Sequence, residues 1–212
     1  NGIYTFKSED NVGHISSYDF QVSNIKKNVL ITPIREVDLE LDSEDLSGVS
    51  TMQFKNEDLA WGTEMPYSNF AEWVLSPGDG LKHVWVRYKD KLGNTSEKIE
   101  DIIILDMTKP ILDFVTINNG DVYTKTREVA LTFKGSDNLT GVTSIFLSND
   151  NKNWTEYPYS ENEKINWILS NGDGIKTVYA KINDGAGNLS NVITDTIFLD
   201  TTKPLAGISI NN

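Results

Sequence analysis

The sequence contains no cysteine, which excludes disulfide bonds, thiolate metal sites and cysteine nucleophiles. It has only two histidines, too few for a histidine-rich zinc site, and it shows no nucleophile elbow, phosphate-binding loop or dinucleotide fingerprint. No stretch approaches the run of about 18 apolar residues that is typical of a membrane span. We therefore expect a protein that is not an enzyme, with no membrane span in this stretch.

Positive charge is also scarce. The chain has 19 lysines and arginines against 31 acidic residues, for a formal net charge of −12. Binding to the phosphate backbone of nucleic acids needs a basic face, so we expect no nucleic-acid partner. An acidic chain instead suits a solvated surface or the binding of divalent cations.

The sequence does contain an internal repeat. Trp73–Ser96 and Trp167–Ser190 share the patterns Trp-x-Leu-x-x-Gly-Asp-Gly and Gly-Asn-x-Ser, and each is followed by Leu-Asp-x-Thr-Lys-Pro. Asp10–Ser16 resembles the end of this unit. Self-similarity at a fixed spacing is the mark of a tandem array. We expect a fragment of a preceding repeat at 1–22, two full domains at 23–108 and 109–202, and the start of another repeat at 203–212.

The strand pattern predicts the fold of each repeat. No segment has helical periodicity, whereas short alternating segments such as 35–41, 49–54, 84–88 and 99–105 are separated by turn residues. About seven strands in a repeat of this length are typical of an antiparallel β-sandwich of the immunoglobulin or fibronectin type III kind. The sequence thus predicts an all-β chain of tandem sandwiches arranged end to end.

These motifs resemble the bacterial Ig-like repeats of large cell-surface and secreted proteins, and the resemblance covers nearly the whole chain. It implies an extracellular or cell-surface location and a spacer that projects another domain, with neighbouring repeats of the same chain as partners. Two alternatives stay open. One is an adhesin module that binds carbohydrate or a host surface protein, and the other is an accessory domain of a polysaccharide-degrading enzyme.

Carboxylates are predicted to gather where two sandwiches meet. In a seven-stranded sandwich, two loops lie at the end where the chain enters: the loop after the second strand and the loop before the last strand. The last strand ends at the opposite end. Stacking would bring together side chains from both domains, namely Asp79, Asp106, Asp137, Asp184 and Asn188. Such oxygen ligands suit Ca²⁺. The alternative is that each aspartate only makes a local turn.

Aromatic residues provide a second candidate site, because flat rings stack on sugars. Trp61, Trp85 and Trp154 are the tryptophans that we consider for ligand binding. Trp61 and Trp154 recur at equivalent places in the two copies, and recurrence favours a role in packing.

Overall fold

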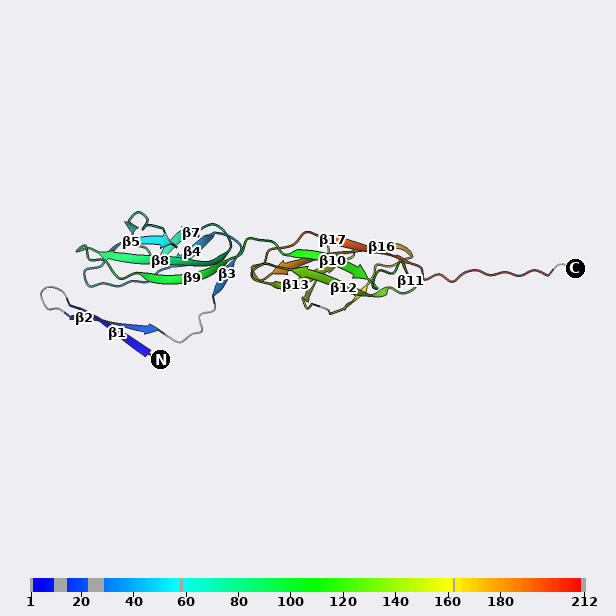
Figure 1. The fold of residues 1–212 in the computed structure, drawn as a ribbon, viewed down its shortest axis with the longest axis horizontal. Helices are drawn as coiled ribbons and strands as arrows, with labels where there is room; N and C mark the ends of the chain where they lie inside the picture. Colours follow the sequence, from blue (N-terminus) through cyan, green and yellow to red (C-terminus); the bar gives the residue numbers. More distant parts are fainter. Residues whose placement is uncertain (1, 10–14, 23–28, 58, 162, 211–212) are drawn as a thin grey trace. The chain divides into compact units, whose positions relative to one another are not determined.

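The computed structural model describes residues 2–9, 15–22, 29–57, 59–161 and 163–210, and these ranges contain strands and no helix (Figure 1). The chain divides into two compact units, residues 1–30 and residues 31–212. The first unit contains a hairpin in which β1 (Gly2–Glu9) pairs antiparallel with β2 (Ile15–Val22). Residues 10–14, which carry most of the motif at 10–16, lie outside the described ranges. That this unit is a fragment of a preceding repeat stays a prediction.

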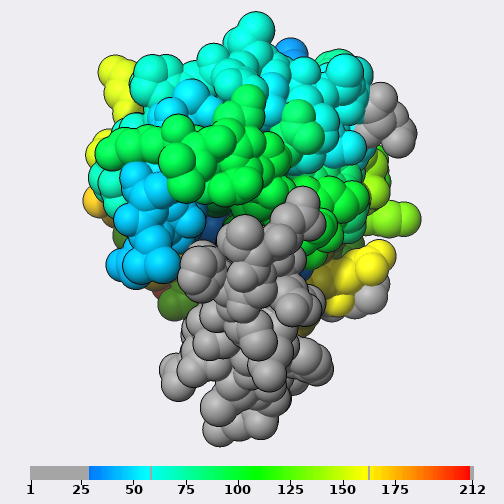
Figure 2. Space-filling model, turned by 90° about the vertical axis from the view of Figure 1, so that its left-hand side faces the viewer, coloured from blue at the N-terminus to red at the C-terminus, as the bar shows by residue number. Residues whose placement is uncertain are grey.

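The first sandwich consists of β3 to β9. Its larger sheet has the order β3-β9-β8-β5-β6, and its smaller sheet pairs β4 with β7. The strands are β3 (Leu30–Thr32), β4 (Glu36–Glu40), β5 (Val49–Asn56), β6 (Met65–Pro66), β7 (Phe70–Val74), β8 (Gly80–Asp90) and β9 (Ile99–Leu105). Figure 2 looks onto this sandwich, whose surface there is built mainly by the cyan and green parts of the chain.

The second sandwich consists of β10 to β17. Its larger sheet has the order β11-β17-β16-β13-β14, and its smaller sheet has the order β10-β12-β15. The strands are β10 (Ile111–Ile117), β11 (Tyr123–Thr124), β12 (Glu128–Ser136), β13 (Val142–Ser148), β14 (Thr155–Pro158), β15 (Ile165–Ile168), β16 (Gly174–Asp184) and β17 (Ile193–Leu199). β11 pairs parallel with β17, while the other pairings of this sandwich are antiparallel.

The two larger sheets have the same strand order, which confirms the prediction of two sandwiches of one type. The match extends to register: Lys55 lies opposite Trp85 in the first sandwich, and Ser148 lies opposite Tyr179 in the second. The short strands β3, β6 and β11 were not predicted, because segments of two or three residues are too short to show alternation. β6 lies in the segment between Trp61 and Tyr67, which contains a proline and shows no alternation.

Alternation along the long strands builds each core. In β16 every second side chain is buried, and Val178, Ala180 and Ile182 lie in the core of the second sandwich. The same alternation in β8 buries Val84 and Val86 in the first sandwich. The intervening side chains of both strands therefore face away from the core.

Several residues that recur in both copies serve the fold of their own sandwich. Trp73 Nε1 donates to Asn56 Oδ1 at 2.7 Å, and Trp167 Nε1 donates to Asn149 Oδ1 at 2.9 Å. The lysine of the Gly-Asp-Gly-x-Lys pattern also has a structural partner, since Lys176 Nζ donates to the carbonyl of residue 171 at 2.8 Å. Each hydrogen bond satisfies a polar group on a largely buried side chain, as packed interiors require.

The Gly-Asp-Gly corner fixes the path by which the chain leaves each sandwich. In the first, Asp79 accepts from the N–H of Met107 at 2.8 Å and from the hydroxyl of Thr108. In the second, Asp173 accepts in the same way from Thr201 and Thr202, at distances of 2.6–2.9 Å. The glycines that flank these aspartates have φ between 79° and 119°, a region that only glycine adopts readily. We call this arrangement the exit lock.

Candidate cation site at the junction of the two sandwiches

Asp106 is the residue through which the first sandwich reaches the second. It follows β9 directly and is fully buried, with 0% of its surface exposed. Its Oδ2 accepts from the hydroxyl of Thr140 at 2.6 Å, and its Oδ1 accepts from the N–H of Thr108 at 3.2 Å. Because Thr140 belongs to the second sandwich, this hydrogen bond links the two domains.

Asp137 lies in the loop between β12 and β13. Its Oδ2 accepts from the backbone N–H groups of Leu139, Thr140 and Gly141, each at 2.9 Å. Its Oδ1 is buried and has no hydrogen-bond partner among the described residues. A buried carboxylate oxygen without a partner is unusual in a folded protein and calls for an explanation, such as a bound ion.

Asp184 ends β16 and is only 2% exposed. Its Oδ1 accepts from the N–H groups of Ala186 and Asn188 at 2.9 Å, and its Oδ2 accepts from Asn188 Nδ2 at 2.9 Å. Asn188 Nδ2 also donates to the carbonyl oxygen of Asp106 at 2.8 Å. The loop after β16 therefore holds its own turn and contacts the preceding sandwich at the same time.

The three carboxylates form a cluster. One oxygen from each of Asp106, Asp137 and Asp184 lies within 4.8 Å of the other two. At an effective dielectric constant of about 20, two unit charges at this distance repel by about 3 kcal/mol. Among the described residues, no lysine, arginine or histidine forms an ion pair with any of the three. Clustered carboxylate oxygens, one of them with no donor among the residues that the structure describes, are the ligand type that Ca²⁺ prefers.

The other two residues considered for this site lie differently. Asp79 is not part of the cluster, because it belongs to the exit lock. Hydrogen bonds from the Thr108 hydroxyl and then from the Met107 N–H lower the pKa of the Asp79 carboxyl below its usual value. Asn188 faces the cluster with its donor group, so in this structure it links the sandwiches. A role of either residue in binding metal stays a prediction.

The alternative that an aspartate only makes a local turn applies to Asp90, the equivalent of Asp184 in the first sandwich. Asp90 Oδ1 accepts from the N–H groups of Leu92 and Asn94 at 2.9 and 2.8 Å, as Asp184 does in the second sandwich. Hydrogen bonds led by the Asn94 side chain lower the pKa of the Asp90 carboxyl. The turn therefore explains why this aspartate recurs, while the proximity of Asp184 to Asp106 and Asp137 depends on the junction.

Each of the three candidate tryptophans lies under a cationic group. The guanidinium carbon of Arg87 is 4.4 Å from the ring centroid of Trp61, and Lys181 Nζ is 4.4 Å from that of Trp154. Lys55 Nζ is 4.9 Å from the centroid of Trp85. These cation–π contacts were missed in the sequence, although Arg87 and Lys181 occupy equivalent places in the repeat. Ligand binding by the tryptophans stays a prediction.

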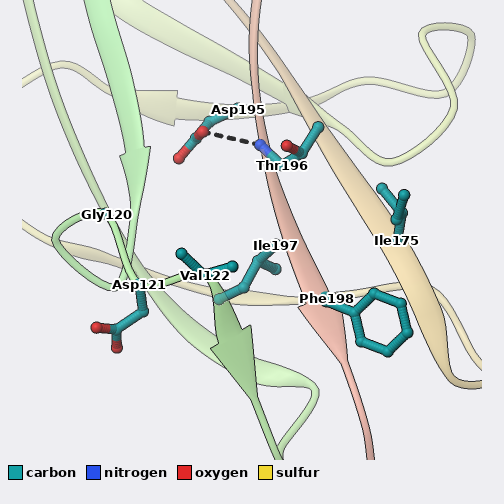
Figure 3. A pocket seen from close by; sticks show the side chains of 8 residues that line it. All are labelled: Gly120, Asp121, Val122, Ile175, Asp195, Thr196, Ile197 and Phe198. Carbon is teal, nitrogen blue, oxygen red and sulfur yellow. Dashed lines mark hydrogen bonds between the residues drawn. The ribbon is translucent and has the colours of Figure 1, made fainter.

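The second sandwich also has an apolar surface pocket that the sequence did not indicate. Its volume is about 370 Å³, and it lies beside β11 and β17 (Figure 3). It is lined by Gly120, Asp121, Val122, Ile175, Asp195, Thr196, Ile197 and Phe198. Asp195 is held by the fold, because its Oδ2 accepts from the N–H of Ile117 at 2.8 Å. The pocket is thus an apolar depression at the sheet edge, away from the carboxylate cluster.

The described ranges include no apolar helix of a length that could cross a membrane. No model of a known protein family matches the sequence, and no curated protein matches it.

Solved structures do match. The fibronectin(III)-like modules of CbhA from Clostridium thermocellum align with a TM-score of 0.50 and 12% identity, over 88% of this chain and 99% of that one. The chain folds as tandem fibronectin-III-like modules. The FN1–FN3 domains of chicken CNTN1 align with a TM-score of 0.50 and 11% identity, over 92% of this chain and 74% of that one. The fold implied by the repeat motifs is therefore confirmed, as two adjacent modules in one chain.

Proposed function

We propose that this chain is a non-catalytic extracellular spacer, part of a bacterial surface or secreted protein, whose module junction is stiffened by Ca²⁺. The observation that carries the proposal is the position of Asp106, from one module, beside Asp137 and Asp184 of the next. A site assembled from two modules couples cation binding to their relative position. A spacer with such a joint holds its modules in a more constant relative direction.

The ligands support Ca²⁺ over softer metals. The three side chains offer oxygen only, and Ca²⁺ takes six to eight oxygen ligands, including backbone carbonyls and water. Structural zinc sites are built mainly from cysteine and histidine, and neither residue occurs in this cluster. Extracellular modules bind Ca²⁺ with dissociation constants of about 10⁻⁴ to 10⁻³ M. When bound, the cation would offset the repulsion among the three carboxylates and hold Asp106 against the second module.

The linker favours a joint of limited freedom. Lys109 precedes Pro110, and a residue before proline is biased toward extended backbone, while proline itself has a fixed φ. The exit lock restrains Met107 and Thr108 just before this pair. Few residues of the linker are therefore free to bend. The cluster includes Asp106, directly before this linker, so a bound cation would restrict the movement that remains.

Small-angle X-ray scattering of the full chain tests the proposal. We expect the distribution of interatomic distances to narrow when Ca²⁺ replaces EDTA, with circular dichroism unchanged. Asp137→Asn should abolish the effect. Asp45→Asn is the matched control, since Asp45 makes a similar turn with Ser47 in the first sandwich and is not in the cluster. Identical scattering curves in Ca²⁺ and EDTA would remove calcium from the proposal.

A further inference from the structure

The larger sheet of the first sandwich carries an unusual outward surface. We call it the basic face and define it by the cations Lys55, Arg87, Lys89 and Lys98 and the indoles of Trp61 and Trp85. Lys55 lies opposite Trp85 across the β5–β8 pair. Alternation in β8 buries Val84 and Val86, so Trp85 and its neighbours two residues along point away from the core.

Cations and rings form one continuous cluster on this surface. Lys55 Nζ lies 4.9 Å from the Trp85 centroid and 5.7 Å from that of Trp61, so it bridges the two indoles. Lys98 Nζ lies 5.5 Å from the Trp85 centroid, and the Arg87 guanidinium lies 4.4 Å from that of Trp61. A cation held over a ring keeps its N–H donors, because the ring attracts the charge without accepting each hydrogen.

Acidic residues also border this surface, among them Glu57, whose carboxylate accepts from the N–H of His83. Glu64 forms an ion pair with Lys89, and Glu100 lies 2.5 Å from His83 Nδ1. Lys55, Arg87 and Lys98 form no ion pair with a described acidic residue. In a chain of net charge −12, these three cations on two indoles, with no ion pair to an acidic residue in the described ranges, form a local concentration of positive charge.

Comparing equivalent positions of the two sandwiches distinguishes residues that the shared fold requires from residues that occur only in the first sandwich. The pair of Arg87 over Trp61 recurs as Lys181 over Trp154, so it belongs to the shared architecture. The other three lysines do not recur. Their places are taken by Ser148, Asn183 and Val192 in a sandwich of the same strand order. The fold therefore does not require these lysines.

We propose that the basic face binds an anionic polysaccharide, a sugar chain that carries carboxylate or sulfate groups. Pyranose rings stack on flat indoles, and the ammonium and guanidinium groups beside them would pair with the acidic substituents. A sheet face is extended and open, which suits a polymer. This role is separate from the calcium joint and does not depend on it.

Two other anionic polymers fit less well. An acidic polypeptide would use the cations and has no rings of its own to stack on the indoles. A nucleic acid has bases to stack, but its dense phosphate charge would be repelled by the rest of a chain of net charge −12. An acidic polysaccharide supplies both rings that stack on the indoles and anionic groups that pair with the cations.

Affinity electrophoresis of the full chain tests this proposal. Native gels would contain polygalacturonate, dextran sulfate or neutral dextran at equal mass. We expect retardation by one or both anionic polymers, decreasing with added salt, and none by neutral dextran. The preferred anionic polymer distinguishes carboxylate from sulfate recognition. The double variant Lys55→Gln with Lys98→Gln should raise the apparent dissociation constant about tenfold, as expected when two partly exposed charge contacts are lost.

The matched control is Lys125→Gln with Lys152→Gln, which removes two exposed lysines from the second sandwich and changes the net charge equally. It should bind like the parent chain, and thermal unfolding checks that both variants are folded. The proposal is overturned by equal loss of binding in the control, by equal retardation in neutral dextran, or by no retardation in any gel. Tighter binding to polyglutamate or to single-stranded DNA would overturn it in favour of those ligands.

Discussion

Calcium should raise the thermal stability of the second sandwich, because two of the three clustered carboxylates, Asp137 and Asp184, belong to it. A ligand that binds only the folded state stabilises it by RT ln(1 + [L]/Kd). With a dissociation constant of about 0.1–1 mM, 10 mM Ca²⁺ contributes about 1.4–2.7 kcal/mol. For a domain of this size, 1 kcal/mol corresponds to about 4–8 °C in melting temperature. The expected rise is therefore about 5–20 °C.

Asp137→Asn should be at least as stable as the parent chain without Ca²⁺ and less stable than the parent chain with it. The asparagine keeps one oxygen that can accept the three N–H groups now bound by Asp137 Oδ2, while one of three mutually repelling charges disappears. In EDTA we expect the variant to be as stable as the parent chain or more so. In 10 mM Ca²⁺ we expect it to be less stable than the parent, because the cation has lost a ligand.

Differential scanning calorimetry of the full chain resolves this pattern, with the two sandwiches followed as separate transitions and Mg²⁺ as a comparison ion. Mg²⁺ demands near-ideal octahedral geometry and gives up its water reluctantly, so its effect should be smaller. Asp45→Asn serves again as the control and should respond to Ca²⁺ like the parent. An equal response to Ca²⁺ in Asp137→Asn would refute the reasoning, since it would place the cation elsewhere.

Three further perturbations address the fold and the exit lock. Tyr159→Phe removes the hydroxyl that accepts from the Gly135 N–H at 2.8 Å and donates to its carbonyl at 3.0 Å, and we expect a loss of about 1–3 kcal/mol in urea unfolding. Hydrogen bonds from Thr202 and Thr201 lower the pKa of the Asp173 carboxyl to about 2. Its contribution to stability is thus full above the unfolded pKa of about 3.9 and is lost as pH falls toward 2. Between these pH values, the melting temperature of Asp173→Asn should therefore change less than that of the parent chain. Gly185→Ala places a Cβ 2.9 Å from the carbonyl oxygen of Thr140, and we expect a cost of about 1–3 kcal/mol in the melting of the second sandwich.

Each of these has a contrary outcome. Tyr67 makes a single hydrogen bond of the same kind, to the Ser43 N–H at 3.1 Å, so a larger loss for Tyr67→Phe than for Tyr159→Phe would contradict the assignment. A parallel shift of both curves between pH 4 and pH 2 would show that Asp173 does not titrate as described. An unchanged melting temperature for Gly185→Ala would show that the second sandwich takes up the added Cβ without cost, against the close contact with the Thr140 carbonyl oxygen.

The repeat made most of the fold predictable. Trp73 and Trp167, in matching patterns, aligned the copies, and alternation along 84–88 and 99–105 marked the long strands of the larger sheet. Loop positions at opposite ends of a sandwich were enough to predict that Asp106 would approach Asp137 and Asp184. These features depend on spacing and topology, which a sequence records directly.

Other features depend on contacts that spacing does not record. Asp79 was expected to join the cluster and instead accepts from Thr108 and Met107, because the chain turns back over the corner after β9. The bridge of Lys55 between two indoles needs the β5–β8 register and the path of the loop that carries Trp61. The apolar pocket beside β17 depends on β11, which has only two residues.

The exit lock implies that the first sandwich sets the direction in which the second begins. Asp173, Thr201 and Thr202 hold the same arrangement at the end of the second sandwich as Asp79 and Thr108 hold at the end of the first. Gain or loss of a whole module by recombination would then carry the matching half of a joint along with it. An array built this way can change length in evolution without redesigning its hinges.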